Sequence, residues 1–253
     1  MTLVDTHCHL NLADKFPDPS KAIREAQDEG VTRMIVVGVD VVHSRLALEI
    51  AEAHEGVFAI VGVHPNYAND YKATDIHAIE EMLKHPKAVA IGEIGLDYHW
   101  DHATPEEQRV ALFAQLELAE STGKPVVFHC RDAYPDLLTL LEERKKLKWL
   151  FHCFAGSLED AAQAIKLDCY FGVDGPITYP KAHDLRSVVQ SLPRDRIVIE
   201  TDAPYLSPAP FRGKPNHPSY VRFVNAGLAA TLGLELEECA ELTTKNAEAF
   251  FGL

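Results

Sequence analysis

The chain has 253 residues, of which 47% are hydrophobic, and its formal net charge is −14. This length suits a single α/β barrel, and the apolar content is ample for a large core. The negative charge argues against a broad passive surface for nucleic acid, because phosphate contacts need lysine and arginine side chains. A phosphate group held locally by bound cations is compatible with this charge.

The cysteines and the apolar segments bear on the location of the protein. Five cysteines, an odd number with no C-x-x-C pair, favour a reducing compartment over a disulfide framework. No apolar run approaches the roughly 18 residues needed to span a bilayer. A strand is expected to begin by Leu3, with no basic segment before it. These features predict a cytoplasmic protein with no membrane partner.

Short runs rich in β-branched residues alternate with segments of helical periodicity along the chain. Strands are expected at 3–7, 33–39, 57–63, 88–94, 125–130, 149–153, 169–175 and 196–202. Helices are expected at 21–30, 44–54, 75–85, 105–122, 135–146, 158–166, 183–192, 221–233 and 236–252.

Eight strands separated by helices predict a single-domain (β/α)8 TIM barrel over residues 1–253. The nearly continuous apolar character of the strands suits a parallel sheet that is buried on both faces. The alternative architecture is an open doubly wound sheet. The number of strands and the residues at the strand ends favour the barrel.

The first expected strand ends in VDTHCHLN, where one residue separates His7 from His9. Since side chains alternate along a strand, these two imidazoles project from the same face. They either share a cation or are two unrelated polar residues at a strand end.

Further histidines and carboxylates fall at the ends of other expected strands. They are His64 in GVHP, Glu93 in AIGEIG, His129 in VVFHC, His152 in LFHCF and Asp202 in VIETD. Because all strands of a barrel point the same way, their carboxyl ends meet at one rim, where barrel active sites lie. Any one of these residues could instead cap a loop or pair with an arginine.

Six of these residues offer four imidazoles and two carboxylates: His7, His9, His129, His152, Glu93 and Asp202. Six ligands are too many for one open catalytic ion and suit two divalent ions that share a carboxylate. We expect Glu93 to be the bridge. The expected sets are His7, His9, Glu93 and Asp202 for one ion, and Glu93, His129 and His152 for the other. Zinc, manganese and magnesium all fit these ligand types.

Seven blocks of the sequence together resemble the TatD family of metal-dependent hydrolases, within the amidohydrolase-like barrels. They are VDTHCHLN, GVHPNY, IGEIGLDYHW, PVVFHCRDA, FHCFAGS, YFGVDGPITYP and ETDAPYLSPAPFRGKPNHP. The resemblance runs from residue 3 to the end. It implies a TIM barrel, a two-metal site on the same six residues and phosphodiesterase activity, usually described as that of a deoxyribonuclease.

The sequence and the resemblance together suggest hydrolysis by a hydroxide bound between two metal ions. Asp202 is the candidate that orients or deprotonates the water, although pure ligation is equally compatible with the sequence. Glu93 and His64 are the other candidate catalytic residues. The expected substrate is DNA or another phosphodiester, single-stranded or taken from a 3′ end.

Two other functions are compatible with the same ligands. The site could hydrolyse an ester or an amide, such as an aminoacyl ester on tRNA, because nothing in the ligand set chooses phosphorus over carbon. A non-catalytic barrel that uses its rim for binding is the third hypothesis.

Several residues around the six are candidates for substrate binding. His64 could bind phosphate, protonate the leaving oxygen or only cap a strand. Arg131 could hold a phosphate through its planar guanidinium, or pair with Asp132 or Asp136. Arg212 and Lys214, in the proline-rich loop after the last strand, form either a local phosphate site or a solvated loop.

Weaker expectations concern the neighbours of these residues. Asp97 is expected to orient a ligand histidine, and Tyr98 and Trp100 to pack in the core or to stack on a base. Three cysteines, Cys8, Cys130 and Cys153, follow proposed ligands and are expected to face away from the site as small buried apolar residues.

Overall fold

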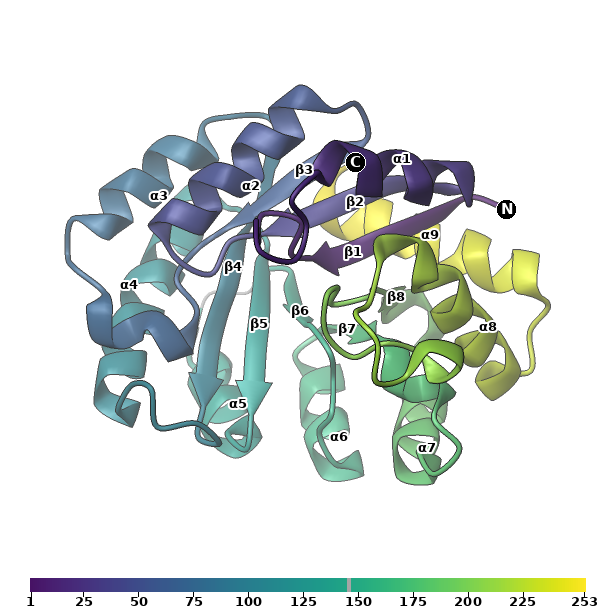
Figure 1. Cartoon of the computed structure of the whole chain (residues 1–253). Coiled ribbons are helices and arrows are strands. Elements are labelled where there is room, and N and C mark those ends of the chain that lie inside the picture. Colours follow the sequence, from purple (N-terminus) through teal and green to yellow (C-terminus); the bar gives the residue numbers. More distant parts are fainter. Residues whose placement is uncertain (145–146) are drawn as a thin grey trace.

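The computed structural model describes residues 1–144 and 147–253, and in these residues eight parallel strands form one sheet in sequence order (Figure 1). The strands are β1 (Leu3–Cys8), β2 (Val31–Val37), β3 (Val57–Val61), β4 (Ala88–Asp97), β5 (Val126–Arg131), β6 (Trp149–Phe151), β7 (Tyr170–Val173) and β8 (Ile197–Ile199). Each strand pairs in parallel with the next along the chain.

The sheet closes where β1 meets the residues that follow β8. Cys8 forms a parallel bridge with Ala203, the Asp202 N–H donates to the His7 carbonyl at 2.9 Å, and the His9 N–H donates to the Ala203 carbonyl at 2.7 Å. The predicted (β/α)8 barrel is therefore confirmed, and the open doubly wound sheet is excluded.

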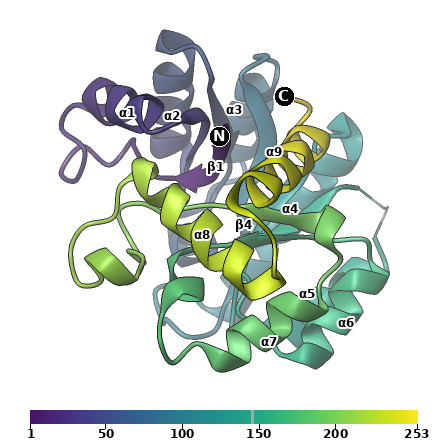
Figure 2. The same cartoon turned by 90° about the vertical axis from the view of Figure 1, so that its right-hand side faces the viewer.

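Helices surround the closed sheet. They are α1 (Pro19–Asp28), α2 (Val41–Ala53), α3 (Asp75–Leu83), α4 (Pro105–Thr122), α5 (Tyr134–Glu142), α6 (Leu158–Lys166), α7 (His183–Ser191), α8 (Val221–Leu232) and α9 (Leu236–Phe251). The last two residues of the helix expected at 135–146 lie outside the described residues. Figure 2 shows α8 and α9 lying together, and α9 packs against β1 and β8. Among the described residues, no helix combines the length and the apolar character required to cross a membrane.

Local sequence signals account for where two of these helices begin. Thr104 accepts a hydrogen bond from the Glu107 N–H, and the Glu107 carboxylate accepts one from the Thr104 N–H. Ser157 and Asp160 form the same reciprocal capping box at the start of α6. These pairs satisfy backbone donors that a helix leaves unpaired in its first turn.

One apolar cluster lies inside the barrel. It takes at least one residue from every strand, for example Val4 from β1 and Val127 from β5, and it is joined by Phe250 of α9. A second, larger cluster fills the space between the strands and the surrounding helices. The buried side chains of His7, His64, His152 and Asp202 lie at or beyond the carboxyl ends of the strands.

The prediction that Glu93 ends its strand is wrong. β4 continues to Asp97, and it remains paired with β5 through Gly95 opposite His129 and Asp97 opposite Arg131. Conversely, β6 and β8 stop early, so that His152 and Asp202 lie in the segments after them. The site residues therefore come from strand interiors as well as from strand ends.

Gly95→Ala is expected to destabilise the contact between β4 and β5. Gly95 has a φ of 147°, and an added Cβ would lie 1.9 Å from the His129 carbonyl oxygen. The disfavoured φ and the overlap with backbone should together lower the free energy of unfolding by about 3 kcal/mol or more. Urea unfolding measures this loss.

Gly123→Ala is the matched control, because Gly123 also has a positive φ, 70°, but has open space around it. It should cost only about 1–2 kcal/mol. Equal losses in the two variants would contradict the close approach of the two strands at Gly95.

Candidate metal centre

Glu93 lies at the centre of a buried cluster. Its Oε1 atom lies 2.7 Å from His152 Nε2 and 2.9 Å from His129 Nδ1, and its Oε2 atom lies 3.4 Å from His7 Nε2. The residue is only 2% exposed. Burial opposes ionisation of the carboxyl, but electrostatic interactions with the surrounding imidazoles, above all that of His152, hold the pKa of Glu93 well below its usual range. The two carboxylate oxygens face different histidines, which is the arrangement that a bridging ligand needs.

Asp202 extends this cluster toward His9. Its Oδ1 atom lies 3.3 Å from His9 Nε2 and 3.9 Å from His7 Nε2. Its backbone has a φ of 55° and is anchored to β1 by the hydrogen bond to His7 that closes the barrel. Ligand atoms within 4.8 Å of one another form three groups: His7, Glu93 and His152; His7, His9 and Asp202; and His64, Glu93 and His129. The structure thus brings together all six residues that the sequence analysis selected as ligands.

The imidazole of His7 tests whether a cation fits among these residues. The side chain is fully buried, and within the described residues neither of its ring nitrogens has a hydrogen-bond partner. A buried polar atom without a partner costs about 1–3 kcal/mol. A cation held by His7 Nε2, Glu93 and Asp202 would provide a partner for Nε2. Imidazoles and carboxylates also suit first-row divalent ions, so these residues fit a divalent metal.

Hydrogen-bond acceptors outside the cluster orient two of the histidines. His9 Nδ1 lies 3.2 Å from the Val37 carbonyl, and His129 Nε2 lies 2.8 Å from Asp97 Oδ2. Because these oxygens only accept, the two ring nitrogens carry hydrogens, and the opposite nitrogens, His9 Nε2 and His129 Nδ1, face Asp202 and Glu93, where they would bind a metal once deprotonated. The expected contact between Asp97 and a candidate ligand histidine is therefore present.

Glu200 is a buried carboxylate that the sequence analysis missed. It is fully buried, and its Oε1 atom lies 3.4 Å from His152 Nδ1. The same oxygen accepts a hydrogen bond from the Cys153 N–H at 2.5 Å, and Oε2 accepts one from the Thr6 hydroxyl at 3.3 Å. A Cβ at Gly172 would lie 2.5 Å from Oε2, so the glycine leaves the space that Glu200 occupies. The signal in the sequence was a glutamate inside the apolar run RIVIETD.

The prediction that Cys153 is a small buried apolar residue is wrong, because it is only partly buried and its thiol has a polar partner. Alternation ends with β6 at Phe151, and Cys153 has a φ of 45°, which redirects its side chain. Its thiol donates to Asp174 Oδ2 at 3.2 Å, and burial raises the pKa of Asp174 to about 8. Cys8 and Cys130 are buried, as expected.

His64 both caps a turn and faces the cluster. Its Nδ1 accepts a hydrogen bond from the Asn66 N–H at 3.0 Å at the start of η1 (Pro65–Asp70), and its Nε2 lies 3.6 Å from Glu93 Oε1. Burial lowers the pKa of His64 to about 3, so the ring is neutral. Since the backbone N–H can only donate, the hydrogen of the neutral ring is on Nε2. His64 therefore presents a donor to the cluster, whereas a metal ligand would present a lone pair.

Arg131 lies exposed at the end of β5. Its guanidinium carbon lies 5.6 Å from the ring centroid of Trp100, which is itself 48% exposed, so the expectation of core packing for Trp100 is wrong. The acidic partners considered for Arg131 make other contacts. His99 Nδ1 lies 3.2 Å from Asp132, and Asp136 interacts with Arg109 at 2.7 Å and with the Tyr98 hydroxyl at 2.9 Å. A phosphate contact by Arg131 stays a prediction.

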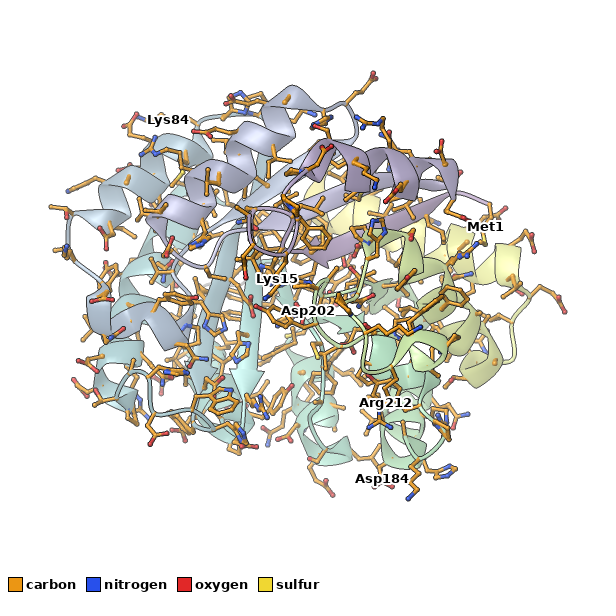
Figure 3. All side chains as sticks on the ribbon, viewed as in Figure 1. Met1, Lys15, Lys84, Asp184, Asp202 and Arg212 are labelled. Atoms are coloured by element: carbon orange, nitrogen blue, oxygen red, sulfur yellow. The ribbon has the colours of Figure 1, made fainter. Side chains whose placement is uncertain are left out.

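Arg212 and Lys214 lie outside the cluster. Figure 3 shows Asp202 near the centre of the view and Arg212 well apart from it. The Arg212 guanidinium lies 4.4 Å from the ring centroid of Tyr179, and Lys214 is exposed. Phosphate contacts by Arg212 and Lys214 likewise stay predictions.

The closed barrel and its buried histidines and carboxylates define an amidohydrolase-like metal-dependent hydrolase. A family model described as TatD related DNase matches residues 4–252. The chain is 40% identical over 251 residues to the uncharacterized metal-dependent hydrolase YabD of Bacillus subtilis strain 168, with 98% of each chain covered. It is 32% identical over 258 residues to the 3′-5′ ssDNA/RNA exonuclease TatD of Klebsiella pneumoniae strain 342, with 99% of this chain and 98% of the relative covered.

A solved structure agrees with these relationships. The crystal structure of YjjV, a TatD homologue from Escherichia coli K12, matches with a TM-score of 0.93 at 30% identity and covers 99% of this chain and 98% of that chain. The chain belongs to the TatD family of metal-dependent hydrolases.

Glu93→Gln is expected to bind at least one divalent ion per chain fewer than the parent protein. The amide lacks the negative charge that the histidines surround, and only its oxygen can ligate. Metal content after loading with zinc or manganese and desalting, measured by mass spectrometry, checks this loss. Glu81→Gln, at an exposed carboxylate paired with Lys84 on α3, is the control and should bind as the parent does. Two ions retained in Glu93→Gln would exclude a bridging role.

Metal affinity is expected to rise with pH. Burial lowers the pKa values of His9, His129 and His152, but neighbouring carboxylates outweigh this effect and raise all three. A protonated imidazole cannot bind a metal, so ion binding must release protons. Affinity should therefore fall as the pH is lowered toward and below the ordinary histidine pKa of about 6.5, by up to about tenfold per pH unit for each proton released. Calorimetric titrations in buffers of different ionisation enthalpy measure the protons released, and an affinity independent of pH would contradict the arrangement.

Proposed function

We propose that this chain is a metal-dependent phosphodiesterase that shortens single-stranded DNA or RNA from its 3′ end. The observation that carries the proposal is the buried cluster in which Glu93 joins two sets of imidazoles and Asp202 lies at its edge. The 3′-5′ ssDNA/RNA exonuclease to which the chain is similar supports the choice of substrate. The net charge of −14 favours a flexible strand end over a long duplex.

Divalent ions bound here would supply Lewis acidity toward a phosphoryl oxygen and would make a nearby water more acidic. Asp202 accepts the proton of the attacking water. Burial opposes its ionisation, but the hydrogen bond from His9 and the charge of His152 lower its pKa, so Asp202 is a carboxylate at neutral pH. Its backbone hydrogen bond to β1 keeps that carboxylate in position.

His64 stabilises the phosphate through its Nε2 hydrogen. This atom lies 3.6 Å from Glu93 Oε1, at the same carboxylate that the metal ligands share. The Asn66 N–H fixes the ring in this tautomer. Among the roles considered for His64, hydrogen-bond donation to a phosphate oxygen is therefore favoured over proton transfer to the leaving group.

Asp202→Asn is expected to reduce cleavage by about 100-fold or more, because the amide cannot accept the proton. Protein that has been stripped and then reloaded with magnesium, manganese or zinc is incubated with 5′-labelled single-stranded DNA. The expected product is a ladder that shortens from the 3′ end and is absent in the variant. Asp184→Asn, an exposed carboxylate on α7, is the control that should leave the ladder unchanged.

The same preparations are given aminoacyl-tRNA, the substrate of the alternative carbonyl hydrolase. Deacylation without any DNA or RNA cleavage would overturn the nuclease proposal in favour of an esterase. Full nuclease activity in Asp202→Asn would leave the nuclease standing but exclude Asp202 as the proton acceptor.

A further inference from the structure

Exposed aromatic side chains are concentrated around the candidate metal centre. In the described part of the chain, those among the exposed large side chains are Tyr67 at 41%, Trp100 at 48%, Phe113 at 39% and Tyr205 at 50%. All but Phe113, which lies on α4, follow the carboxyl end of a strand or its extension. Exposed aromatic rings at a rim are suited to recognition of another flat ring.

Two of these rings, Tyr67 and Tyr205, terminate an arc of aromatic side chains that contains the candidate ligands. The Tyr205 centroid lies 6.0 Å from that of His9, and the Tyr67 centroid lies 6.3 Å from that of His64. Between them, successive rings of His9, His7, His152, His129 and His64 lie 5.1, 4.0, 5.7 and 4.3 Å apart. The two tyrosines therefore flank the place where a scissile bond would lie.

Hydrogen bonds hold the backbone at both tyrosines, while the phenol hydroxyls make none within the described residues. The Asn216 side-chain amide donates to the carbonyls of Thr201 and Tyr205 at 2.7 Å each, which holds the loop after β8. Tyr67 lies in η1, and its N–H donates to the His64 carbonyl at 2.9 Å. Within the described residues, neither phenol hydroxyl takes part in a hydrogen bond of the fold. These rings are thus available to a ligand.

The charges at the rim also favour stacking as the main source of affinity. Burial raises the pKa of Tyr205, and so do the charges of Asp202 and of Tyr67, while Lys15 lowers it. Lys15 forms an exposed ion pair with Asp14 at 2.9 Å. A rim with few free cations gains more binding affinity from stacking on the π-face of a base than from phosphate contacts. Every nucleotide base offers such a face.

We propose that Tyr67 and Tyr205 form a base-stacking clamp that holds the two nucleotides joined by the scissile phosphodiester at a single-stranded end. This inference rests on the proposed function and names how the substrate is recognised. Because every base has a π-face, the clamp is tolerant of sequence. It requires unstacked bases, and it therefore selects single strands over duplexes.

The test combines protein variants with altered substrates. The metal-loaded enzyme is given a 5′-labelled single-stranded oligonucleotide, or the same strand with abasic residues on both sides of its 3′-terminal phosphodiester. Removing the bases should raise the KM of the parent enzyme about tenfold or more. Tyr67→Ala and Tyr205→Ala should each raise the KM for the normal strand about tenfold, with little further effect on the abasic strand.

Two further variants separate stacking from a structural role. Tyr67→Phe and Tyr205→Phe keep the ring and should restore the KM of the parent. Phe113→Ala removes the exposed aromatic ring on α4 and should leave the KM for both strands unchanged. Equal effects of the alanine variants on normal and abasic strands, or no effect on either, would overturn the clamp.

A binding measurement separates this inference from the proposed function. Fluorescence anisotropy of the labelled strands on the metal-loaded Asp202→Asn variant, with and without each tyrosine substitution, needs no turnover. If the parent enzyme cleaves no strand, the proposed function fails. A preference for the normal strand that depends on the tyrosines would then still support the clamp, and equal affinities for the two strands would reject it.

Discussion

The charge of Glu93, buried inside the barrel among imidazoles, is the constraint on which the rest of the structure depends. A carboxylate removed from water is costly unless other groups compensate its charge. Here the compensation comes from His7, His129 and His152, which three different strands or their extensions supply. Those side chains reach one point only if the sheet is closed. The candidate metal centre therefore depends on closure of the barrel.

Orientation of the imidazoles is the next requirement. A histidine binds a metal only through a deprotonated nitrogen, so its other nitrogen must be held by an acceptor. Val37 from β2 and Asp97 from β4 take this place for His9 and His129, and the Glu200 carboxylate, in the segment after β8, lies 3.4 Å from His152 Nδ1. Glu200 in turn depends on the absence of a side chain at Gly172. The orientation of the candidate ligand histidines thus depends on residues, such as Gly172, that would not contact an ion.

The sequence predicted the barrel and the convergence of the six candidate ligands because both follow from simple periodicities. Alternation along a strand places His7 beside His9, and parallel closure brings the strand ends together. Prediction from the sequence failed at positions where this periodicity ends. The left-handed backbone at Cys153 follows the early end of β6, and Glu93 lies within a strand that extends farther than its apolar run. Glu200 was missed because a carboxylate inside an apolar strand gives no sign of which histidine it will contact.

Substrate recognition was also predicted only in part, because the sequence analysis selected cationic side chains as the candidate binding residues. Arg212 and Lys214 stand out in a proline-rich loop, yet Arg212 packs over Tyr179 and lies apart from Asp202. A protein of net charge −14 gains little from a few exposed cations, since salt screens such contacts. Stacking is not screened, and it brings the scissile phosphate to the metal ligands without a basic surface. An acidic barrel can therefore act on nucleic acid, provided that its substrate offers unpaired bases.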